Sequence, residues 1–312
     1  MNPDAGDHRL RRDPLSGAWV VLAPGRRARP GAPTGGAGAV SPPPCPFCPG
    51  NEALTPPEVD ALRPPDTRPD GPGWTVRVVP NKYPAFPRSH EVIVHSPDHG
   101  RDMEDLDEAA AEAVLDMYAR RLDAHLGAGA RAVTIICNRG SRAGSSLEHP
   151  HSQLYALPIV PPLLLEELEN LTRYRNRYGE CLLCAALDDA RAAPASLLFD
   201  DLLVAWVPAA ARWPFEVRLA PAHHEEDFRA ADTGATAVAM RRVIGALRRA
   251  AGDAPINYWL HTAPADLRGP FHWHFEFAPR FAAPAAFELG TGMTIDELEP
   301  EEAAARLRAA LD

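Results

Sequence analysis

The stretch "LEHPHSQLYALP", residues 147–158, contains the pattern from which the fold and the site can be predicted. It is typical of a β-strand, and the side chains of a strand alternate between two faces. His149 and His151 therefore point to the same face. Prolines at 150 and 158 bound the strand, because proline lacks the N–H that a sheet requires. We interpret the paired imidazoles as having different tasks: one holds a metal and the other meets a substrate.

Two other segments of the chain follow a common plan. They are "WTVRVVPNKYPAFPRSHEVIVHSPDH" (74–99) and "LLVAWVPAAARWPFEVRLAPAHH" (202–224). Each predicts a strand, a Val-Pro turn, a proline-containing loop and a second strand. A predicted helix follows each segment, over about 105–126 and about 232–250.

The repetition continues beyond the helices. Each helix leads to a strand with an asparagine, Asn138 in "ICNRG" and Asn257 in "PINYW". Each half then reaches an H-x-H strand, the second being "FHWHFEF", and a C-x-x-C pair precedes each block. Such internal repetition indicates two halves built on one plan. We predict domains at 1–165 and 166–312, joined near 160–178.

The predicted strands are short, alternating and linked by turns, with helices between them. This pattern predicts an α+β fold, in which each half is an antiparallel sheet with packed helices. Near the C-terminus, Thr294 and Glu297 form a candidate capping box that would start a helix. The sequence has no G-x-x-x-x-G-K-[ST] loop and no G-x-G-x-x-G after a strand, so phosphate must be recognised by other means.

Composition limits the class of protein. The chain has 312 residues, of which 46% are hydrophobic and 24% charged, and a formal net charge of -10. The negative charge argues against broad nucleic-acid binding. No apolar run approaches the length of a membrane span, and the N-terminus lacks the apolar core of a signal peptide. We therefore expect a cytoplasmic protein without a membrane partner.

Four of the five cysteines form two C-x-x-C pairs, which in the absence of a secretory signal favour metal over disulfides. The fifth, Cys137, lies in the apolar run "AVTIICN" and is predicted to be buried. Zinc prefers tetrahedral sets of thiolates and imidazoles. The first half offers Cys45, Cys48, His99 and His149. The second offers Cys181, Cys184, either His223 or His224, and either His272 or His274, of which we take His224 and His272 as the candidate ligands.

The alternative is that these cysteines are unliganded core or redox pairs. The same C-x-x-C…H…H-x-H order twice in one chain favours zinc at both places. Four protein ligands close a zinc site, so these metals would be structural rather than catalytic. His151 would then be held beside the first metal and would remain free for chemistry.

"HPHSQ" (149–153), together with "CPFCPGN" (45–51), resembles the galactose-1-phosphate uridylyltransferase family of the histidine-triad superfamily. The resemblance covers nearly the whole chain, including "DPLSGAWVVLAPGRRARP", "VVPNKYPAF" and "HSPDH". It implies two histidine-triad-like halves, zinc as cofactor, a homodimer, and a nucleoside-diphosphate sugar and a hexose 1-phosphate or phosphate as substrates.

The resemblance also implies residue roles. His151 would attack the α-phosphorus of the nucleotide sugar in a ping-pong mechanism. Gln153 stands where histidine-triad hydrolases carry a third histidine, and an amide there would stabilise the adduct and favour transfer over hydrolysis. The residues that match family positions near the phosphates or the base are Arg26, Arg29, Asn81, Asn138, Ser145 and Ser146. The alternative for these six is ordinary loop charges and turn residues.

Three features depart from the best-known transferases of the family. Ser152 replaces a glycine, the Cys181/Cys184 pair replaces a second site built on a glutamate, and "FELGTGM" places Thr291 and Gly292 where a Tyr-Glu pair stands. All three resemble the ADP-glucose phosphorylase branch, which uses inorganic phosphate as the acceptor.

The function predicted from the sequence is that of a UDP-glucose:hexose-1-phosphate (galactose-1-phosphate) uridylyltransferase, which would place the enzyme in galactose metabolism. The alternative enzyme is a nucleoside-diphosphate-sugar phosphorylase of the ADP-glucose type. A third hypothesis, a zinc-stabilised binding protein that has lost its chemistry, is disfavoured by the intact HPHSQ core.

Overall fold

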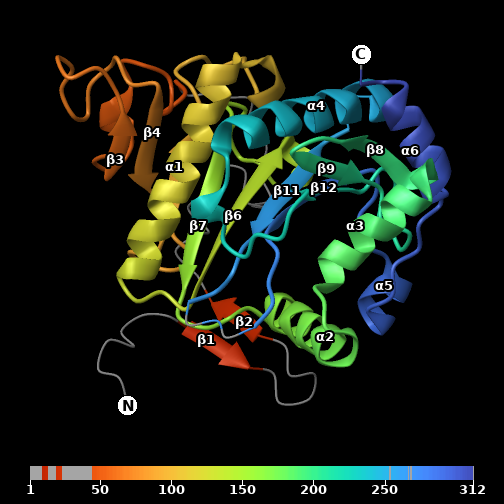
Figure 1. Ribbon diagram of the computed structural model, residues 1–312. Helices are drawn as coiled ribbons and strands as arrows, with labels where there is room; N and C mark the ends of the chain where they lie inside the picture. Colours follow the sequence, from red (N-terminus) through yellow and green to blue (C-terminus); the bar gives the residue numbers. More distant parts are fainter. Residues whose placement is uncertain are drawn as a thin grey trace.

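A computed structural model describes residues 9–12, 19–22, 44–252, 254–265, 267 and 269–311 (Figure 1). Most of the strands form one ten-stranded sheet in which every paired neighbour is antiparallel. The order across the sheet is β3 (Asp60–Leu62), β4 (Val76–Pro80), β5 (His90–Val94), β7 (His151–Leu157), β6 (Ala132–Arg139), β11 (Ile256–His261), β12 (His274–Pro279), β10 (Val217–Pro221), β9 (Leu203–Trp206) and β8 (Leu197–Asp200). A separate hairpin pairs β1 (Arg9–Arg12) with β2 (Trp19–Leu22).

The sheet has two halves that meet where β6 pairs with β11. The first five strands in the order come from the N-terminal half of the chain and the last five from the C-terminal half. The predicted α+β class with antiparallel sheets is confirmed. Both halves share one continuous sheet and one main core, and residues 165 and 166 lie inside the helix α2 (Pro162–Tyr178). The division at 165 therefore stays a prediction.

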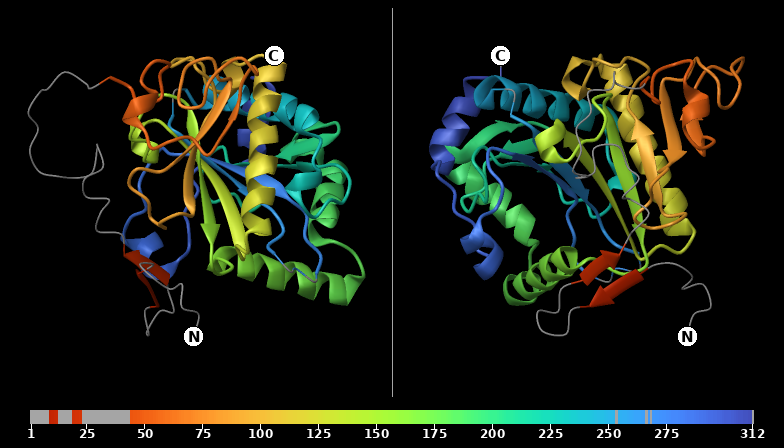
Figure 2. Two further views of the ribbon diagram at one scale, coloured as in Figure 1. Left: turned by 90° about the vertical axis from the view of Figure 1, so that its left-hand side faces the viewer. Right: turned by 180° about the vertical axis from the view of Figure 1, so that it is seen from behind.

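Two long helices, α1 (Glu108–Gly127) and α4 (Thr233–Ala251), pack against each other on one side of the sheet (Figures 1 and 2). Their N-caps are Asp107 and Asp232, whose carboxylates each accept a backbone N–H of the first turn. The buried face of α1 includes Val114, Tyr118 and Leu122, spaced four residues apart. The predictions of helices over about 105–126 and about 232–250 are confirmed.

The remaining helices are α3 (Leu182–Ala192), α5 (Ala286–Thr291) and α6 (Pro300–Arg308), with 3-10 turns η2 (Glu52–Leu54), η3 (Met103–Asp105), η4 (Ser141–Ala143), η5 (Pro194–Ser196) and η6 (Phe228–Ala230). The predicted helix start at Thr294 and Glu297 is wrong, because α6 begins at Pro300. Proline disfavours the helical conformation in the preceding residue, Glu299, and is tolerated in the first turn, so Pro300 sets the start.

The strand register corrects the equivalence between Asn138 and Asn257. Cys137 pairs with Ser152 across β6 and β7, so Asn138 is the next residue and lies across from His151. In the second half the residue paired with the corresponding histidine, His274, is His261. Asn257 instead pairs with Asn138 across the junction of the halves, donating from Nδ2 to its Oδ1 over 2.7 Å.

Candidate active site and metal centres

The first cysteine pair lies beside two histidines from other parts of the fold. Cys45 and Cys48 occupy a turn closed by the Cys48 N–H to the Cys45 carbonyl. His99 follows β5, and His149 lies two residues before the start of β7. The Sγ of Cys48 lies 3.4 Å from Nδ1 of His99, and both sulfurs lie 3.7 Å from Nδ1 of His149. All four predicted ligands of the first half are therefore brought together.

These distances fit a tetrahedral metal. Sulfur and nitrogen ligands of one tetrahedral zinc ion are about 3.5 Å apart. His149 is oriented for this role, because its Nε2 bonds the carbonyl of Ser96 at 2.8 Å. Burial also lowers the pKa of His149, which keeps the ring neutral. A neutral ring with its proton on Nε2 presents the Nδ1 lone pair to the sulfurs, as metal-binding histidines do.

The second cysteine pair forms a similar cluster. Cys181 is the residue just before the first turn of α3, and Cys184 lies in that turn. His224 follows β10, and His272 precedes β12. Cys184 Sγ lies 3.7 Å from Nδ1 of His224 and 3.6 Å from Nδ1 of His272, and Cys181 Sγ lies 4.0 Å from the latter. His272 Nε2 bonds the Pro221 carbonyl at 3.1 Å.

The structure distinguishes the alternative histidines of the second half. The side chain of His223 is 72% exposed and faces Glu225. His274 is buried and directs Nδ1 to the carbonyl of His272, over 3.1 Å. His224 and His272 are thus the histidines whose ring nitrogens reach the sulfurs. Burial lowers the pKa of His272 to about 4, so this ring is neutral at physiological pH.

His151, the first residue of β7, has the geometry expected of a nucleophile. Its Nδ1 bonds the backbone carbonyl of His149 at 2.8 Å. The carbonyl accepts, so Nδ1 carries the proton and Nε2 presents a lone pair. The ring packs against Phe47, which lies between the two cysteines of the first pair, with centroids 5.2 Å apart. Phe47 therefore places His151 directly beside the first cysteine pair.

Gln153 lies on the same strand face two residues further along β7. Its Oε1 is 2.9 Å from Nε2 of His90, a buried residue at the start of β5, and 3.1 Å from the hydroxyl of Tyr155. Asn81 reaches the same place, with its Nδ2 3.1 Å from His90 Nε2. The predicted Asn81 and Gln153 thus both lie against His90, which sequence reasoning missed.

The other predicted phosphate-binding residues are placed in part. Asn138 lies near the end of β6, across from His151. Ser145 lies in the loop before His149, where its hydroxyl donates to the Leu147 carbonyl at 2.6 Å. Ser146 is the next residue of that loop. Arg26 and Arg29 lie outside the described residues.

A buried polar network supports β7 from its other face. Ser152 Oγ lies 2.7 Å from Nε2 of His95 and hydrogen-bonds the hydroxyl of Tyr118 on α1. Burial lowers the pKa of His95 to about 3, so its ring stays neutral. Cys137 is buried as predicted and donates its thiol to the His151 carbonyl at 3.4 Å. A glycine in place of Ser152 could not form this network.

A third group of possible ligands lies in the second half. Glu167 of α2 accepts from Nδ1 of His261 at 2.9 Å, and its other oxygen lies 3.6 Å from Nε2 of His274. Sequence reasoning missed Glu167 and His261 because they share no local motif. In the structure the three side chains lie against one another, and the hydrogen bond of Glu167 to His261 attaches α2 to the sheet.

Glu276 occupies in β12 the place that Gln153 has in β7, two residues after the second histidine of the H-x-H. It is paired with Arg212 at 2.5 Å and with Arg218 at 3.4 Å. Burial raises the pKa of Glu276, but the charges of His274, Arg212 and Arg218 more than offset this and lower it from 4.5 to about 2. The second half therefore has a paired carboxylate where the first has an amide.

This shift predicts the pH dependence of stability. Between pH 4.5 and about 2 the unfolded chain protonates Glu276 while the folded chain does not. The unfolded state binds more protons, so this carboxylate stabilises the fold above pH 4.5 and loses its effect as pH falls through the window. Glu276→Gln should make the free energy of unfolding less dependent on pH there. Denaturant titrations of both proteins across the window measure this, and equal pH slopes would contradict it.

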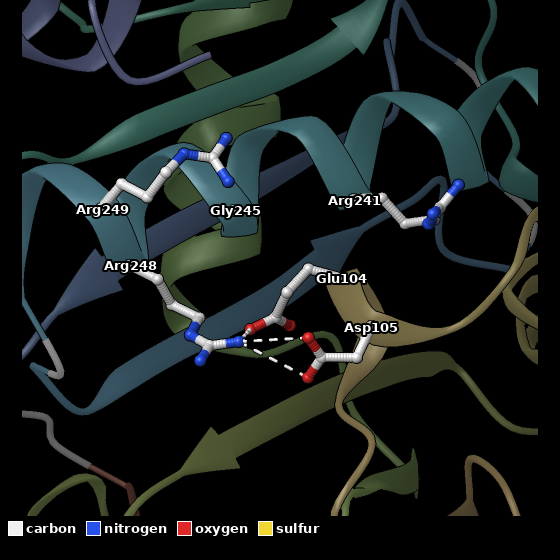
Figure 3. Close-up of a pocket in the computed structure, with 6 residues that line it drawn as sticks. All are labelled: Glu104, Asp105, Arg241, Gly245, Arg248 and Arg249. Atoms are coloured by element: carbon white, nitrogen blue, oxygen red, sulfur yellow. Dashed lines mark hydrogen bonds and ion pairs between the residues drawn. The ribbon is translucent and has the colours of Figure 1, made fainter. Parts of the chain in front are cut away.

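A polar pocket of about 350 Å³ lies between η3 and α4 (Figure 3). It is lined by Glu104, Asp105, Arg241, Gly245, Arg248 and Arg249. Arg248 is bound to Glu104 at 2.7 Å and to Asp105 at 3.3 Å, and Arg249 donates to the Ala310 carbonyl. These charged groups are paired within the protein, and no predicted site residue lines this pocket in the described part of the chain.

Comparison with known proteins agrees with this architecture. Residues 89–161 match the galactose-1-phosphate uridyl transferase N-terminal domain. An ADP-glucose phosphorylase of Arabidopsis thaliana is 30% identical over 96% of this chain and 92% of its own length. A galactose-1-phosphate uridylyltransferase of Thermotoga maritima is 27% identical over 96% of this chain and 97% of its own length. The crystal structure of an Arabidopsis thaliana ADP-glucose phosphorylase with bound ADP-glucose superposes with a TM-score of 0.77 at 29% identity, covering 96% of this chain and 97% of the other.

The fold and the site define a two-half α+β protein in which an H-x-H strand borders a Cys/His cluster in each half. The chain belongs to the galactose-1-phosphate uridylyltransferase family, which includes the ADP-glucose phosphorylase relative. No helix in the described part of the chain is both long and apolar enough to cross a membrane.

Proposed function

We propose that the protein is a nucleotidylyltransferase of the UDP-glucose:hexose-1-phosphate type, acting through a nucleotidyl-histidine on His151. The observation that carries the proposal is the orientation of His151. Its Nδ1 is fixed on the His149 carbonyl at 2.8 Å, so Nε2 keeps its lone pair for attack. Both the uridylyltransferase and the phosphorylase relatives align over nearly the whole chain, which supports shared chemistry.

In the first half-reaction, Nε2 of His151 attacks the α-phosphorus of the nucleoside-diphosphate hexose. The N–P bond forms, the bond from the α-phosphorus to the bridging oxygen breaks, and a hexose 1-phosphate leaves with the electron pair. The Nδ1 proton stays in place and is stabilised by the His149 carbonyl as the ring becomes positive. In the second half-reaction an oxygen of the acceptor phosphate attacks the same phosphorus, and His151 leaves as neutral imidazole.

Gln153 assists both half-reactions in this proposal. A side-chain amide donates a hydrogen bond to a phosphoryl oxygen without delivering a proton. A group that delivered a proton would assist the reaction with water, whereas the amide stabilises the adduct until the acceptor arrives. This supports transfer over hydrolysis.

We further propose that both Cys/His clusters hold zinc. Cys45, Cys48, His99 and His149 would bind the first ion, and Cys181, Cys184, His224 and His272 the second. Zinc supplies structural cross-links here, because four protein ligands leave no position for water. The first cluster thereby fixes His149, whose carbonyl orients His151. The homodimer, the hexose 1-phosphate acceptor and the cytoplasmic location stay predictions of the family resemblance and the sequence.

The second candidate function is that of an ADP-glucose phosphorylase, in which inorganic phosphate is the acceptor. Two observations favour it. The first is the 30% identity with the Arabidopsis thaliana phosphorylase. The second is that the features resembling the phosphorylase branch are built into the structure, since Ser152 is hydrogen-bonded to His95 and the Cys181/Cys184 pair meets two histidines.

The experiment that tests both is intact-protein mass after brief incubation with UDP-glucose or ADP-glucose and no acceptor. We expect a UMP-sized increment that disappears when galactose 1-phosphate is added. An AMP-sized increment discharged by phosphate would establish the phosphorylase instead. If zinc-replete protein forms neither adduct, the nucleotidyl-histidine mechanism with these donors is contradicted.

A further inference from the structure

The ring of His90 has its protonation set by a backbone group. His90 is only 2% exposed, and its ring stacks on Tyr155 with centroids 4.1 Å apart. The backbone N–H of Ala85 donates to its Nδ1 over 3.1 Å. A backbone N–H can only donate, so Nδ1 must be unprotonated. The neutral ring therefore carries its proton on Nε2.

That proton meets the side-chain oxygen of Gln153. Nε2 of His90 lies 2.9 Å from Oε1 of Gln153, and the Tyr155 hydroxyl donates to the same oxygen over 3.1 Å. Asn81 Nδ2, 3.1 Å from the same Nε2, is itself a donor and cannot accept the proton. Its own oxygen is held by the Tyr83 N–H at 2.8 Å.

These contacts decide which way the amide of Gln153 points. In a glutamine the oxygen and nitrogen can exchange places by a half-turn, and the hydrogen-bond network fixes the choice. A half-turn here would bring the NH₂ group against the N–H of His90 and would leave that buried donor without an acceptor, although the Tyr155 hydroxyl could accept from the turned amide. The cost of an unpaired buried donor therefore holds the oxygen inward. The NH₂ group faces away from His90.

We propose that His90 is a positioning residue, which orients the amide of Gln153 so that NH₂ rather than the oxygen meets the substrate phosphoryl group. This inference rests on the proposed function, in which Gln153 donates to a phosphoryl oxygen. The N–H of Ala85 fixes the tautomer of His90, and the Nε2–H of His90 in turn fixes the orientation of the Gln153 amide. Without His90, the amide oxygen could turn toward the phosphoryl group and repel it.

The test is a double-mutant cycle on turnover. His90→Phe keeps an aromatic ring against Tyr155 but removes both ring nitrogens. We expect kcat to fall by about 10²-fold, the effect of losing one donor to a phosphoryl or oxyanion group, with KM changing less. Gln153→Ala should show a similar loss. The double variant should be no slower than Gln153→Ala alone, because His90 acts only through that amide.

Tyr155→Phe is the matched variant, since it removes the second donor to the same oxygen and leaves His90 in place. Its loss of kcat should be smaller than that of His90→Phe. The positioning role is wrong if His90→Phe keeps full turnover. It is also wrong if the double variant loses kcat by the product of the two single losses. Full turnover in Gln153→Ala would overturn the donor role of Gln153, and the positioning role with it, while an adduct on His151 would still support nucleotidyl transfer.

A second measurement needs no variant. The nitrogen-15 chemical shifts of histidine-labelled protein report which ring nitrogen carries the proton. We expect His90 to show protonated Nε2 and unprotonated Nδ1 at neutral pH. The opposite tautomer, or a doubly protonated ring, would overturn the inference, because Nδ1 could then not accept from Ala85.

Discussion

Replacing His151 with alanine is expected to reduce nucleotidyl transfer by about 10⁴-fold or more, as loss of a covalent nucleophile does in other enzymes. The side chain forms the bond to phosphorus in the proposed mechanism, and Nδ1 of His151 already has its partner in the His149 carbonyl. His149 cannot take over, because its Nε2 is bound to the Ser96 carbonyl and its Nδ1 faces the cysteines. Steady-state turnover and intact-protein mass with UDP-glucose and ADP-glucose measure the loss.

The matched control is His223→Ala, which makes the same chemical change at an exposed position where the ring reaches no cysteine. It should retain turnover and adduct formation. His151→Ala should also retain the metal content of the parent protein, since its ring is no ligand of the first cluster. Normal turnover in His151→Ala would show that the nucleophile is elsewhere. Loss of metal in the same variant would show that the effect is structural.

The two Cys/His clusters could be predicted because their chemistry is visible in short motifs. A C-x-x-C turn brings two thiolates together locally, and the period of a strand sets His149 and His151 on one face. The order of these motifs then indicated the histidines that meet the first cysteine pair, and for the second pair it left two adjacent or nearly adjacent histidines open at each position. The structure brings together both predicted sets.

The rest depended on the register between strands, which no local motif encodes. Asn257 resembles Asn138 in sequence, yet the register makes His261 the equivalent residue. His90 is in an apolar strand, sixty-three positions before Gln153 in the chain. The two residues meet only because β5 pairs with β7. Glu167 reaches its histidines from a helix in the expected join. Long-range packing, rather than propensity, decides these contacts.

Replacing Cys45 with serine is expected to remove the metal of the first cluster and to lower stability strongly. The cluster joins three segments distant in sequence: the turn at Cys45 and Cys48, the segment after β5 with His99, and the segment just before β7 with His149. Metal binding to a closed site contributes directly to folding, because the unfolded chain has no preformed site. We expect the free energy of unfolding to fall by about 4 kcal/mol or more, which for a chain of 312 residues lowers Tm by roughly 6 °C or more.

Metal analysis of the purified protein and thermal unfolding measure both effects. Cys137→Ser is the matched control, since it makes the same change at a buried cysteine outside both clusters and should keep the full metal content. Cys45→Ser should also slow transfer, because a loosened His149 no longer fixes the carbonyl that orients His151. If Cys45→Ser keeps the metal content and the Tm of the parent, the first cluster holds no structural metal. Loss of metal with unchanged turnover would instead separate the cluster from the chemistry, leaving His151 oriented by the backbone of β7 alone.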